Sequence, residues 1–290
     1  MRRRLDTELV RRGLAPSRTR AAELVREGRI TVAGAPALTP ARQVGADEAV
    51  AVQGPPRRFV SRGGDKLDGV LDRFGVDVAG RDALDVGAST GGFTDCLLQR
   101  GARRVVAVDV GTNQLAWSLR NDPRVVVLEQ TDIREYETIE PPPTVVTVDV
   151  AFVSVLKIAP ALVRAATREA DLVLLVKPQF EAGRARVGRG GVVRDAAVHG
   201  AVLREVRDGL AELGVQAVAI APSPLRGADG NAEFFLHGRL DAPDSARCAD
   251  TELDAVVAAV HPAAVSTSGN APDPAPERDD EHEHEHEVDA

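Results

Sequence analysis

Lysine is nearly absent from this 290-residue chain. Lysine and arginine together number 36, yet only Lys66, Lys157 and Lys177 are lysines. Arginine therefore supplies almost all of the positive charge. Because arginine keeps its proton at physiological pH, a site that needs a cation able to release a proton has to use one of these lysines. Lys66 and Lys177 belong to a set of lysines and carboxylates on predicted helices and strands. Lys157 belongs to no such set and is predicted to be solvated.

Long apolar runs and cysteines are also scarce. No stretch of 18 apolar residues occurs, so no transmembrane helix is expected, and the basic N-terminus lacks the apolar segment of a secretory signal. The two cysteines, Cys96 and Cys248, stand far apart and without the spacing of metal ligands. We therefore expect a cytoplasmic protein with free thiols, no bound metal and no membrane partner.

The charges are unevenly distributed along the chain. Residues 1–62 hold thirteen arginines and six acidic residues, whereas residues 241–290 hold two arginines and fourteen acidic residues. The basic end indicates an anionic partner. The acidic end is rich in alanine and proline and cannot bury enough apolar surface to fold, so a disordered tail is predicted over 241–290. One short helix at 251–261 is compatible with it, and its three alternating histidines fit a disordered tail better than a metal site.

Residues 1–53 have the pattern of a small α+β domain. Helices are predicted over 5–13 and 18–29, the second capped by Ser17, and two short strands follow, at 30–32 and 49–52. This unit resembles the α-L RNA-binding domain of a ribosomal protein and of many pseudouridine synthases, which implies RNA binding; an ordinary solvated helix is the alternative. The arginines that would contact RNA on this domain are Arg4, Arg18 and Arg20.

After a proline-containing linker at 54–62, residues 63–240 alternate apolar strands with helices. Continuous apolar strands are typical of a parallel sheet covered on both faces, so a doubly wound, Rossmann-like α/β sheet is predicted. The last two strands are joined by the loop 221–231 without a helix. They are therefore expected to be antiparallel, as in methyltransferase sheets. The predicted strands are 83–86, 105–110, 125–128, 145–150, 172–177, 215–221 and 233–236, and the main helices are 91–100, 154–168 and 196–213.

A glycine-rich turn, DVGASTGGF, ends the first of these strands. Ser89 stands where a dinucleotide fingerprint needs glycine. The carboxylate of Asp85 would repel a pyrophosphate but suits a ligand that carries ammonium and sulfonium charges. Asp109 ends the second strand, where it can accept hydrogen bonds from ribose hydroxyls, and Asp132 follows the third, where it can meet an adenine amino group. The predicted cofactor-binding residues are Asp85, Gly87, Ser89, Gly91, Gly92, Phe93, Asp109 and Asp132.

Two lysines and two carboxylates form a second pattern. Asp149 and Lys177 end the fourth and fifth strands, Lys66 lies on the helix that opens the domain, and Glu233 lies at the last strand. This set resembles the Lys–Asp–Lys–Glu tetrad of ribose 2′-O-methyltransferases of the FtsJ-like group. Together with the N-terminal domain, residues 1–240 resemble the TlyA-type haemolysins, a family of rRNA cytidine 2′-O-methyltransferases.

That resemblance implies S-adenosylmethionine as cofactor and 16S and 23S rRNA in the 30S and 50S ribosomal subunits as partner, with a monomer favoured. A ribose hydroxyl is a poor nucleophile, so Lys177, beside Lys66, is expected to take or steer its proton. Asp149 and Glu233 would then hold the lysines. The sequence departs from the family at Phe59, where the family's interdomain motif Arg-x-Trp-Val has tryptophan; this weakens a stacking role at that position.

The segment after Lys177 is a glycine-rich basic loop that is expected to clamp the RNA backbone, although a solvated loop is nearly as compatible with its composition. Its predicted RNA-binding residues are Arg184, Arg186 and Arg189. With 3% aromatic residues, RNA recognition should depend on shape and phosphates, and Trp117 and Tyr136 are predicted to pack inside the protein. Two alternatives to the enzyme stay open: an RNA-binding ribosome-assembly factor and a membrane-active haemolysin.

Overall fold

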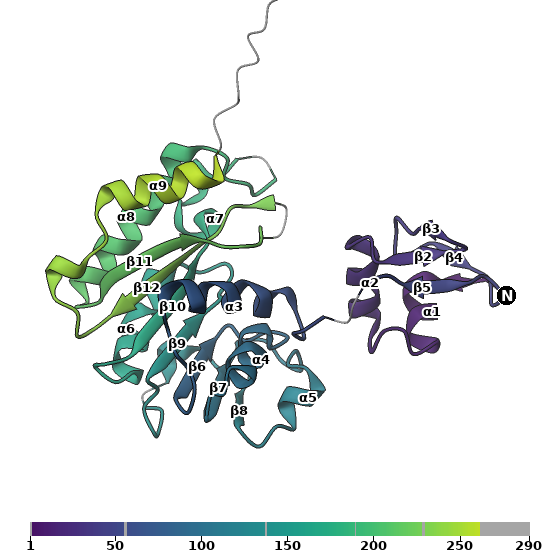
Figure 1. Ribbon diagram of the computed structural model, residues 1–290, viewed down its shortest axis with the longest axis horizontal. Helices are drawn as coiled ribbons and strands as arrows, with labels where there is room; N and C mark the ends of the chain where they lie inside the picture. The colour runs from purple at the N-terminus through teal and green to yellow at the C-terminus, as the bar shows by residue number, and fades with distance from the viewer. Residues whose placement is uncertain (1, 55–56, 137, 189, 228–229, 262–290) are drawn as a thin grey trace, which may run out of the picture.

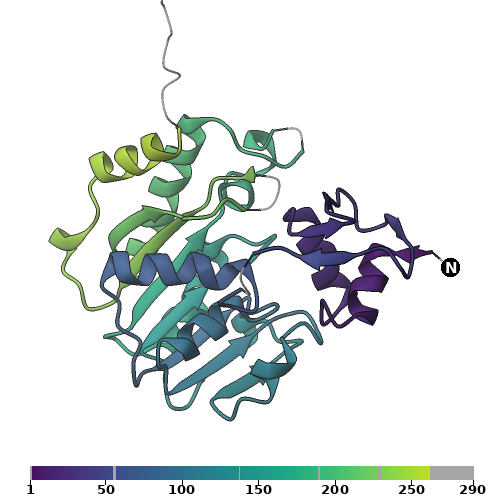
Figure 2. The ribbon, with the colours of Figure 1, turned by 45° about the vertical axis from the view of Figure 1, so that its right-hand side comes forward.

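The computed structural model describes residues 2–54, 57–136, 138–188, 190–227 and 230–261. They form two domains that lie side by side and are connected by the segment leading into helix α3 (Arg62–Phe74) (Figures 1 and 2). The predicted α/β fold with a small N-terminal α+β domain is confirmed. Within the described residues, no helix is long and apolar enough to cross a bilayer.

The N-terminal domain packs two helices against short strands. Ser17 caps the second helix by accepting a hydrogen bond from the Arg20 backbone N–H at 3.2 Å. Leu5, Leu9 and Ile30 are fully buried in the small core between the helices and the strands. The elements are β1 (Arg3–Arg4), α1 (Leu5–Arg11), α2 (Arg18–Arg26), β2 (Ile30–Val32), β3 (Ala35–Pro36), β4 (Gln43–Val44) and β5 (Val50–Val52).

The second domain is built on a seven-stranded sheet in the order β11-β12-β10-β9-β6-β7-β8. β12 runs antiparallel between β10 and β11, whereas the pairs from β10 through β8 are parallel. The predicted antiparallel ending is therefore confirmed. The strands are β6 (Asp82–Val86), β7 (Arg104–Val108), β8 (Val125–Leu128), β9 (Val145–Val148), β10 (Asp171–Val176), β11 (Gln216–Pro222) and β12 (Phe234–Arg239).

Helices cover both faces of this sheet because successive strand side chains point to opposite sides. On β6, Ala83 enters the cluster formed with α3, α4 and α5, whereas Leu84 and Val86 enter the cluster formed with α6, α8 and α9. Both clusters are continuous apolar cores, which explains why the strands lack polar alternation. The helices beyond α3 are α4 (Gly92–Gln99), α5 (Trp117–Arg120), α6 (Val155–Ala165), α7 (Pro178–Glu181), α8 (Ala196–Glu212) and α9 (Asp250–Val260).

Four predictions concern the surroundings of single side chains. Lys157 is exposed, and both cysteines are free, as predicted. Tyr136 packs against the larger core, also as predicted. Trp117 was predicted to pack as well, and this was wrong: it begins the short helix α5 and is 77% exposed.

The acidic tail begins later than the sequence predicts. Disorder was predicted from residue 241, yet α9 forms and buries Leu253, Val256 and Val257 against α8 and β11. Arg207 holds the start of α9 through its Nη1, which donates to the Asp250 carboxylate at 2.6 Å. The composition of residues 241–290 as a whole did not reveal this amphipathic segment, although the sequence was compatible with a short helix at 251–261. The remaining tail, residues 262–290, lies outside the described residues.

If α9 is part of the folded domain, Leu253→Ala should lower the free energy of unfolding by about 2–5 kcal/mol, since the lost side chain leaves a cavity in the core. Urea denaturation followed by circular dichroism measures this. The matched control is Thr251→Ala on the exposed face of α9, with an expected change within about 0.5 kcal/mol. Equal unfolding midpoints for wild type and Leu253→Ala would show that α9 does not contribute to the fold.

Candidate functional site

The predicted polar residues gather at one edge of the large sheet. Asp109, Asp149 and Lys177 directly follow the parallel strands β7, β9 and β10, so they emerge at the carboxyl edge. β12 runs in the opposite direction, and Glu233, which directly precedes it, is therefore brought to the same edge. Open α/β sheets bind their ligands at this edge.

Two cavities open at this edge and meet each other. The first, here called the sheet-edge cavity, has a volume of about 470 Å³ and lies over the ends of β6, β7 and β9. The second, the interdomain cavity, has a volume of about 570 Å³ and lies between that edge, the start of α3 and helix α2 of the N-terminal domain. The residues that line both cavities are Gly87, Ser89, Asp149 and Ala151.

A carboxylate and a folded loop organise the sheet-edge cavity. Asp109 accepts hydrogen bonds from the backbone N–H groups of Ser89 and Gly111, each at 2.7 Å. The Ser89 hydroxyl donates to the Gln114 side chain at 3.2 Å. Each carboxylate oxygen can accept more than one hydrogen bond, so Asp109 keeps acceptor capacity for a ligand in the cavity.

The far part of the same cavity combines apolar walls with one more carboxylate. Asp132 begins the 3₁₀ turn Ile133–Glu135, and hydrogen bonds from the Arg134 side chain lower its pKa. Phe152 stands at this cavity 91% exposed, with its ring 5.1 Å from that of Phe180. The apolar residues that line this part are Val108, Ile133, Val150, Val153 and Ile158. Such a slot suits a flat heterocycle with a polar edge.

The glycines of the turn allow close packing of the protein against itself. Gly87 has φ of 84°, and a Cβ there would lie 2.4 Å from the backbone oxygen of Asp149. A Cβ on Gly92 would lie 2.2 Å from the Ser61 hydroxyl. The turn therefore packs closely against the end of β9 and the start of α3, and a side chain at either glycine would force these segments apart.

The eight predicted cofactor residues divide into three groups. Gly87, Ser89, Asp109 and Asp132 line the sheet-edge cavity. Gly92 and Phe93 line the interdomain cavity, and the Phe93 ring also stacks on Phe235 in the core with centroids 6.0 Å apart. Gly91, the left-handed N-cap of α4, and Asp85 line neither cavity.

Asp85 was expected to face a cationic ligand, but its side chain is directed into the core. Its carboxyl accepts hydrogen bonds from the Thr94 hydroxyl at 2.6 Å and the Thr147 hydroxyl at 3.2 Å. Burial raises the pKa of Asp85 to about 7. The direction of the Asp85 side chain could not be predicted from the sequence, because neighbouring side chains at a strand end alternate between the core and the ligand-binding edge. Asp85 therefore connects the end of β6 to α4 and to β9 beneath the glycine-rich turn.

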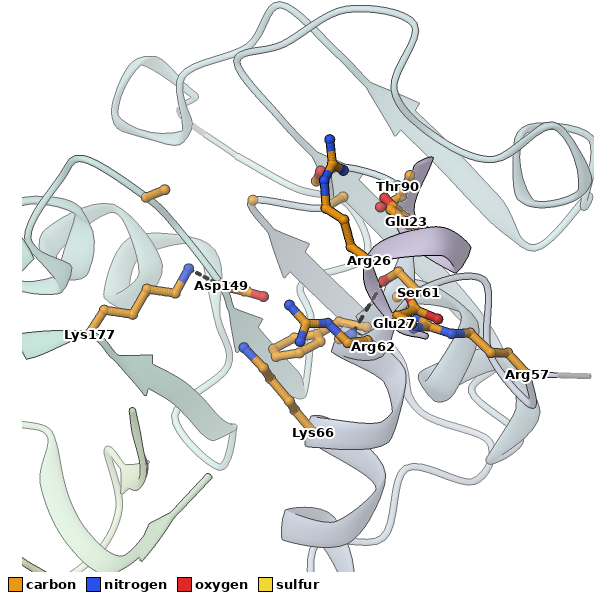
Figure 3. Close-up of a pocket in the computed structure, with 17 residues that line it drawn as sticks. Glu23, Arg26, Glu27, Arg57, Ser61, Arg62, Lys66, Thr90, Asp149 and Lys177 are labelled. Carbon is orange, nitrogen blue, oxygen red and sulfur yellow. Dashed lines mark hydrogen bonds and ion pairs between the residues drawn. The ribbon is translucent and has the colours of Figure 1, made fainter. Parts of the chain in front are cut away.

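The four residues of the lysine–carboxylate set form two ion pairs. Lys177 Nζ lies 2.5 Å from Asp149 Oδ1, and Lys66 Nζ lies 2.5 Å from Glu233 Oε2 (Figure 3 shows the first pair). Lys66, Asp149 and Lys177 line the interdomain cavity, while Glu233 is buried behind Lys66. The structure thus brings together all four residues from α3, the ends of β9 and β10, and the start of β12.

The predicted RNA-binding arginines are less available than their number suggests. Arg20 is only 17% exposed and is held by Glu23 at 2.9 Å and Glu27 at 3.2 Å on the same helix. Arg4 pairs with Asp6 at 2.7 Å, and Arg18 reaches the same carboxylate at 3.5 Å while staying largely exposed.

The described part of the basic loop after Lys177 also contains both an arginine held by an ion pair and an arginine free to bind a ligand. Arg186 forms a paired contact with both Glu205 oxygens, at 2.8 and 2.9 Å, which fastens the loop to α8. Arg184 is exposed and pairs with no carboxylate in the part of the chain that the structure describes. Arg189 lies outside the described residues. Arg184 is therefore the described residue of this loop best able to meet a phosphate.

Several residues that line the cavities were missed by sequence reasoning. Gln114, Arg134 and Phe152 line the sheet-edge cavity, and Arg26 and Arg62 line the interdomain cavity. No motif singles them out, since each lies in a loop or on a helix whose orientation depends on the fold. Phe59, at the departure from the linker motif, is buried in the core against Gly64, with the Arg58 guanidinium 4.7 Å from its ring centroid.

Within the described residues, no group of three or more His, Cys, Asp or Glu side chains is arranged to hold a metal ion. The histidines of the tail lie outside those residues.

Known protein families match both domains of the chain. Residues 59–240 match the FtsJ-like methyltransferase family, and residues 3–50 match the S4 domain. The chain is 52% identical over 238 residues to the Mycobacterium tuberculosis protein named 16S/23S rRNA (cytidine-2′-O)-methyltransferase TlyA, with 81% of this chain and 89% of that one covered. It is 39% identical to Hemolysin A of Brachyspira hyodysenteriae, with 81% and 98% covered. A solved structure of a candidate hemolysin from Streptococcus thermophilus superposes with a TM-score of 0.73 at 38% identity, covering 90% of this chain and 96% of that one.

The raised pKa of Asp85 predicts a specific pH dependence of stability. Its carboxyl ionises near 3.8 when unfolded and near 7 when folded, so between these values the unfolded state binds fewer protons than the folded state. The free energy of unfolding therefore falls as the pH rises through this window. Asp85→Asn cannot ionise and should lose less stability than wild type between pH 5 and pH 8.

Urea denaturation at pH 5 and pH 8 tests this. The control is Asp65→Asn, which removes an exposed carboxylate. The dependence of its stability on pH should parallel that of wild type. A profile of Asp85→Asn that also parallels wild type would contradict the assigned protonation of Asp85.

Proposed function

The chain belongs to the FtsJ-like methyltransferase family, and from this membership we propose that it transfers a methyl group from S-adenosylmethionine to the ribose 2′-hydroxyl of cytidine in rRNA. The observation that supports this proposal most directly is the meeting of two cavities at Gly87, Ser89 and Asp149. A direct transfer needs the donor and the acceptor to approach each other from opposite sides of one point. One cavity would hold the cofactor and the other the target nucleotide.

The sheet-edge cavity fits S-adenosylmethionine. Asp109 would accept hydrogen bonds from the ribose hydroxyls, and Asp132 would accept one from the adenine amino group. The apolar walls around Ile133 and Val153 would hold the adenine ring. When bound, the cofactor supplies an electrophilic methyl group on a sulfonium. Gly87 and Ser89 would place that end at the junction of the cavities.

The two ion pairs at the interdomain cavity account for activation of the hydroxyl. Lys177 would take or steer the proton of the ribose hydroxyl as the oxygen attacks. Asp149 would orient Lys177 through its 2.5 Å contact, and Glu233 would do the same for Lys66. Because both carboxylates are held by the sheet edge, the two ammonium groups are positioned before the substrate arrives.

The domain organisation supports a ribosomal substrate. We propose an RNA-binding domain over residues 1–53, a linker over 54–62 and the methyltransferase domain over 63–240, acting as a monomer. The N-terminal domain matches the S4 family. The Mycobacterium tuberculosis protein that is similar to the whole chain is named for both 16S and 23S rRNA. Arg18 and Arg184, whose side chains are largely exposed, would contact the RNA backbone in the 30S or 50S subunit.

Two other functions make different demands on the protein. An assembly factor that lacks activity would have no use for two ion-paired lysines in the interdomain cavity, next to its junction with the sheet-edge cavity. A membrane-active function is suggested by the name of the Brachyspira relative. A liposome-leakage assay separates it from methyl transfer, because only a membrane-active protein would release an entrapped dye.

Replacing Asp109 should weaken cofactor binding. Asp109→Ala removes the acceptor for the ribose hydroxyls and releases the turn at Ser89, so the Kd for S-adenosylmethionine should rise about 10- to 100-fold. Isothermal titration calorimetry measures this without RNA. Asp122→Ala removes a carboxylate that pairs with Arg124 and lines neither cavity, and it should leave the Kd unchanged. An unchanged Kd for Asp109→Ala would place the cofactor elsewhere.

Replacing Lys177 should abolish methyl transfer while cofactor binding persists. Lys177→Ala should lower the rate of methylation of purified 30S and 50S subunits by more than about 100-fold, since proton transfer contributes that much or more. Transfer of tritium from labelled S-adenosylmethionine into rRNA measures the rate. Lys157→Ala, which changes an exposed lysine, is the matched control and should keep full activity.

The chemistry itself has its own control. A substrate RNA with deoxycytidine at the modified position should take up no label from the wild-type protein. Label in the deoxy substrate would indicate base methylation, and full activity of Lys177→Ala would refute the proposed role of the lysine set.

A further inference from the structure

The interdomain cavity contains two guanidinium groups that the proposed mechanism does not use. Arg26 is the last residue of α2 in the N-terminal domain, and Arg62 is the first residue of α3 in the methyltransferase domain. Both line the cavity that also contains Lys66, Asp149 and Lys177. Figure 3 shows that the two arginines extend from different helices next to this lysine set.

The charges around this cavity do not cancel. Glu23 and Glu27 are each held by Arg20, at 2.9 and 3.2 Å, and Glu27 also pairs with Arg57. The remaining carboxylate in the lining, that of Asp149, pairs with Lys177. Every acidic residue in the cavity lining thus already has a cationic partner.

Arg26 and Arg62 have no such partner. Both side chains are exposed, and neither forms an ion pair or a side-chain hydrogen bond within the part of the chain that the structure describes. Two uncompensated guanidinium groups beside a catalytic centre favour an anionic ligand, and guanidinium binds phosphate well because it presents paired donors.

Arg26 also connects the catalytic centre with the outer surface of the N-terminal domain. A second hollow on α2 is lined by Arg26 together with Arg18, Thr19 and Asp6. Arg26 thus borders both this hollow and the interdomain cavity. A small anion would need only one of the two, whereas a nucleic-acid strand could pass from Arg18 over Arg26 to the lysine set.

We infer that Arg26 and Arg62 bind the RNA phosphates on the two sides of the target nucleotide, so that the N-terminal domain contributes a residue directly to the reaction site. This inference rests on the proposed function. Holding both flanking phosphates fixes the ribose between them and directs its 2′-hydroxyl to the junction of the two cavities. The N-terminal domain then positions the substrate at the reacting nucleotide in addition to tethering the ribosome.

Kinetics of variants test the inference. Arg26→Ala and Arg62→Ala should each lower kcat/KM for subunit methylation about 10- to 100-fold, since each loses a charge-assisted hydrogen bond. Arg26→Lys should retain more activity than Arg26→Ala, because a lysine loses the paired donors but still offers the phosphate a point charge. The matched control is Arg73→Ala, which removes an exposed arginine from the other end of α3 and should change kcat/KM by less than about twofold.

A comparison with Arg18 separates positioning from tethering. Under single-turnover conditions with saturating subunits, Arg26→Ala should still be slow, whereas Arg18→Ala should recover the wild-type rate. The slope of log affinity against log salt concentration should decrease by about 0.7–0.9 for each phosphate contact that is lost. The Kd for S-adenosylmethionine should stay unchanged in all of these variants, and thermal melting confirms that they are folded.

The possible results have distinct meanings. If wild type methylates subunits and Arg26→Ala behaves like Arg73→Ala, the inference is overturned while the proposed function stands. A raised Kd for S-adenosylmethionine in Arg62→Ala would assign that arginine to the cofactor's carboxylate and would also overturn it. If wild type transfers no methyl group to any rRNA, the proposed function and the inference fail together.

Discussion

The buried ion pair between Lys66 and Glu233 is the interaction on which the site depends. It joins the first turns of α3 to the start of β12, across 167 residues of sequence. A buried charge that loses its partner is strongly destabilising, so neither residue can move or change alone. Because α3 directly follows the interdomain linker, this pair also fixes where the methyltransferase domain begins. The pair therefore ties the start of α3, which lines the interdomain cavity, to the central sheet.

The direction of β12 makes that pair possible. In a fully parallel sheet, the residue before a strand would lie at the amino edge, far from Asp149 and Lys177. Because β12 runs antiparallel beside β10, the residue before it lies at the carboxyl edge, and Glu233 completes the lysine–carboxylate set. The strand order thus has a chemical consequence. The antiparallel strand thus adds Glu233 to an edge at which the parallel strands already place Asp109, Asp149 and Lys177.

Much of this arrangement could be predicted from the sequence. Continuous apolar strands and the helix-free loop before β12 indicated the fold. The rarity of lysine drew attention to Lys66 and Lys177, and the resemblance to the FtsJ-like tetrad joined them with Asp149 and Glu233; the structure brings all four together. Side-chain direction and tertiary packing could not be predicted in the same way. Asp85 turns into the core, Trp117 is exposed, and the acidic end contains α9, because each outcome depends on neighbours distant in the sequence.

The arginines show why charge counting alone cannot define an RNA-binding surface. The N-terminal segment has a large excess of arginine, yet Arg20 is tied to two glutamates and Arg4 to an aspartate. An arginine that is already paired must break that pair before it binds a phosphate, so it contributes less to affinity than an unpaired one. Arg26, which no sequence pattern distinguishes, keeps its charge uncompensated because α2 directs its glutamates toward Arg20 and Arg57 instead. Ion pairing within the protein thus leaves Arg26 and Arg62 available at the boundary between the two domains, in the cavity that Lys66 and Lys177 also line.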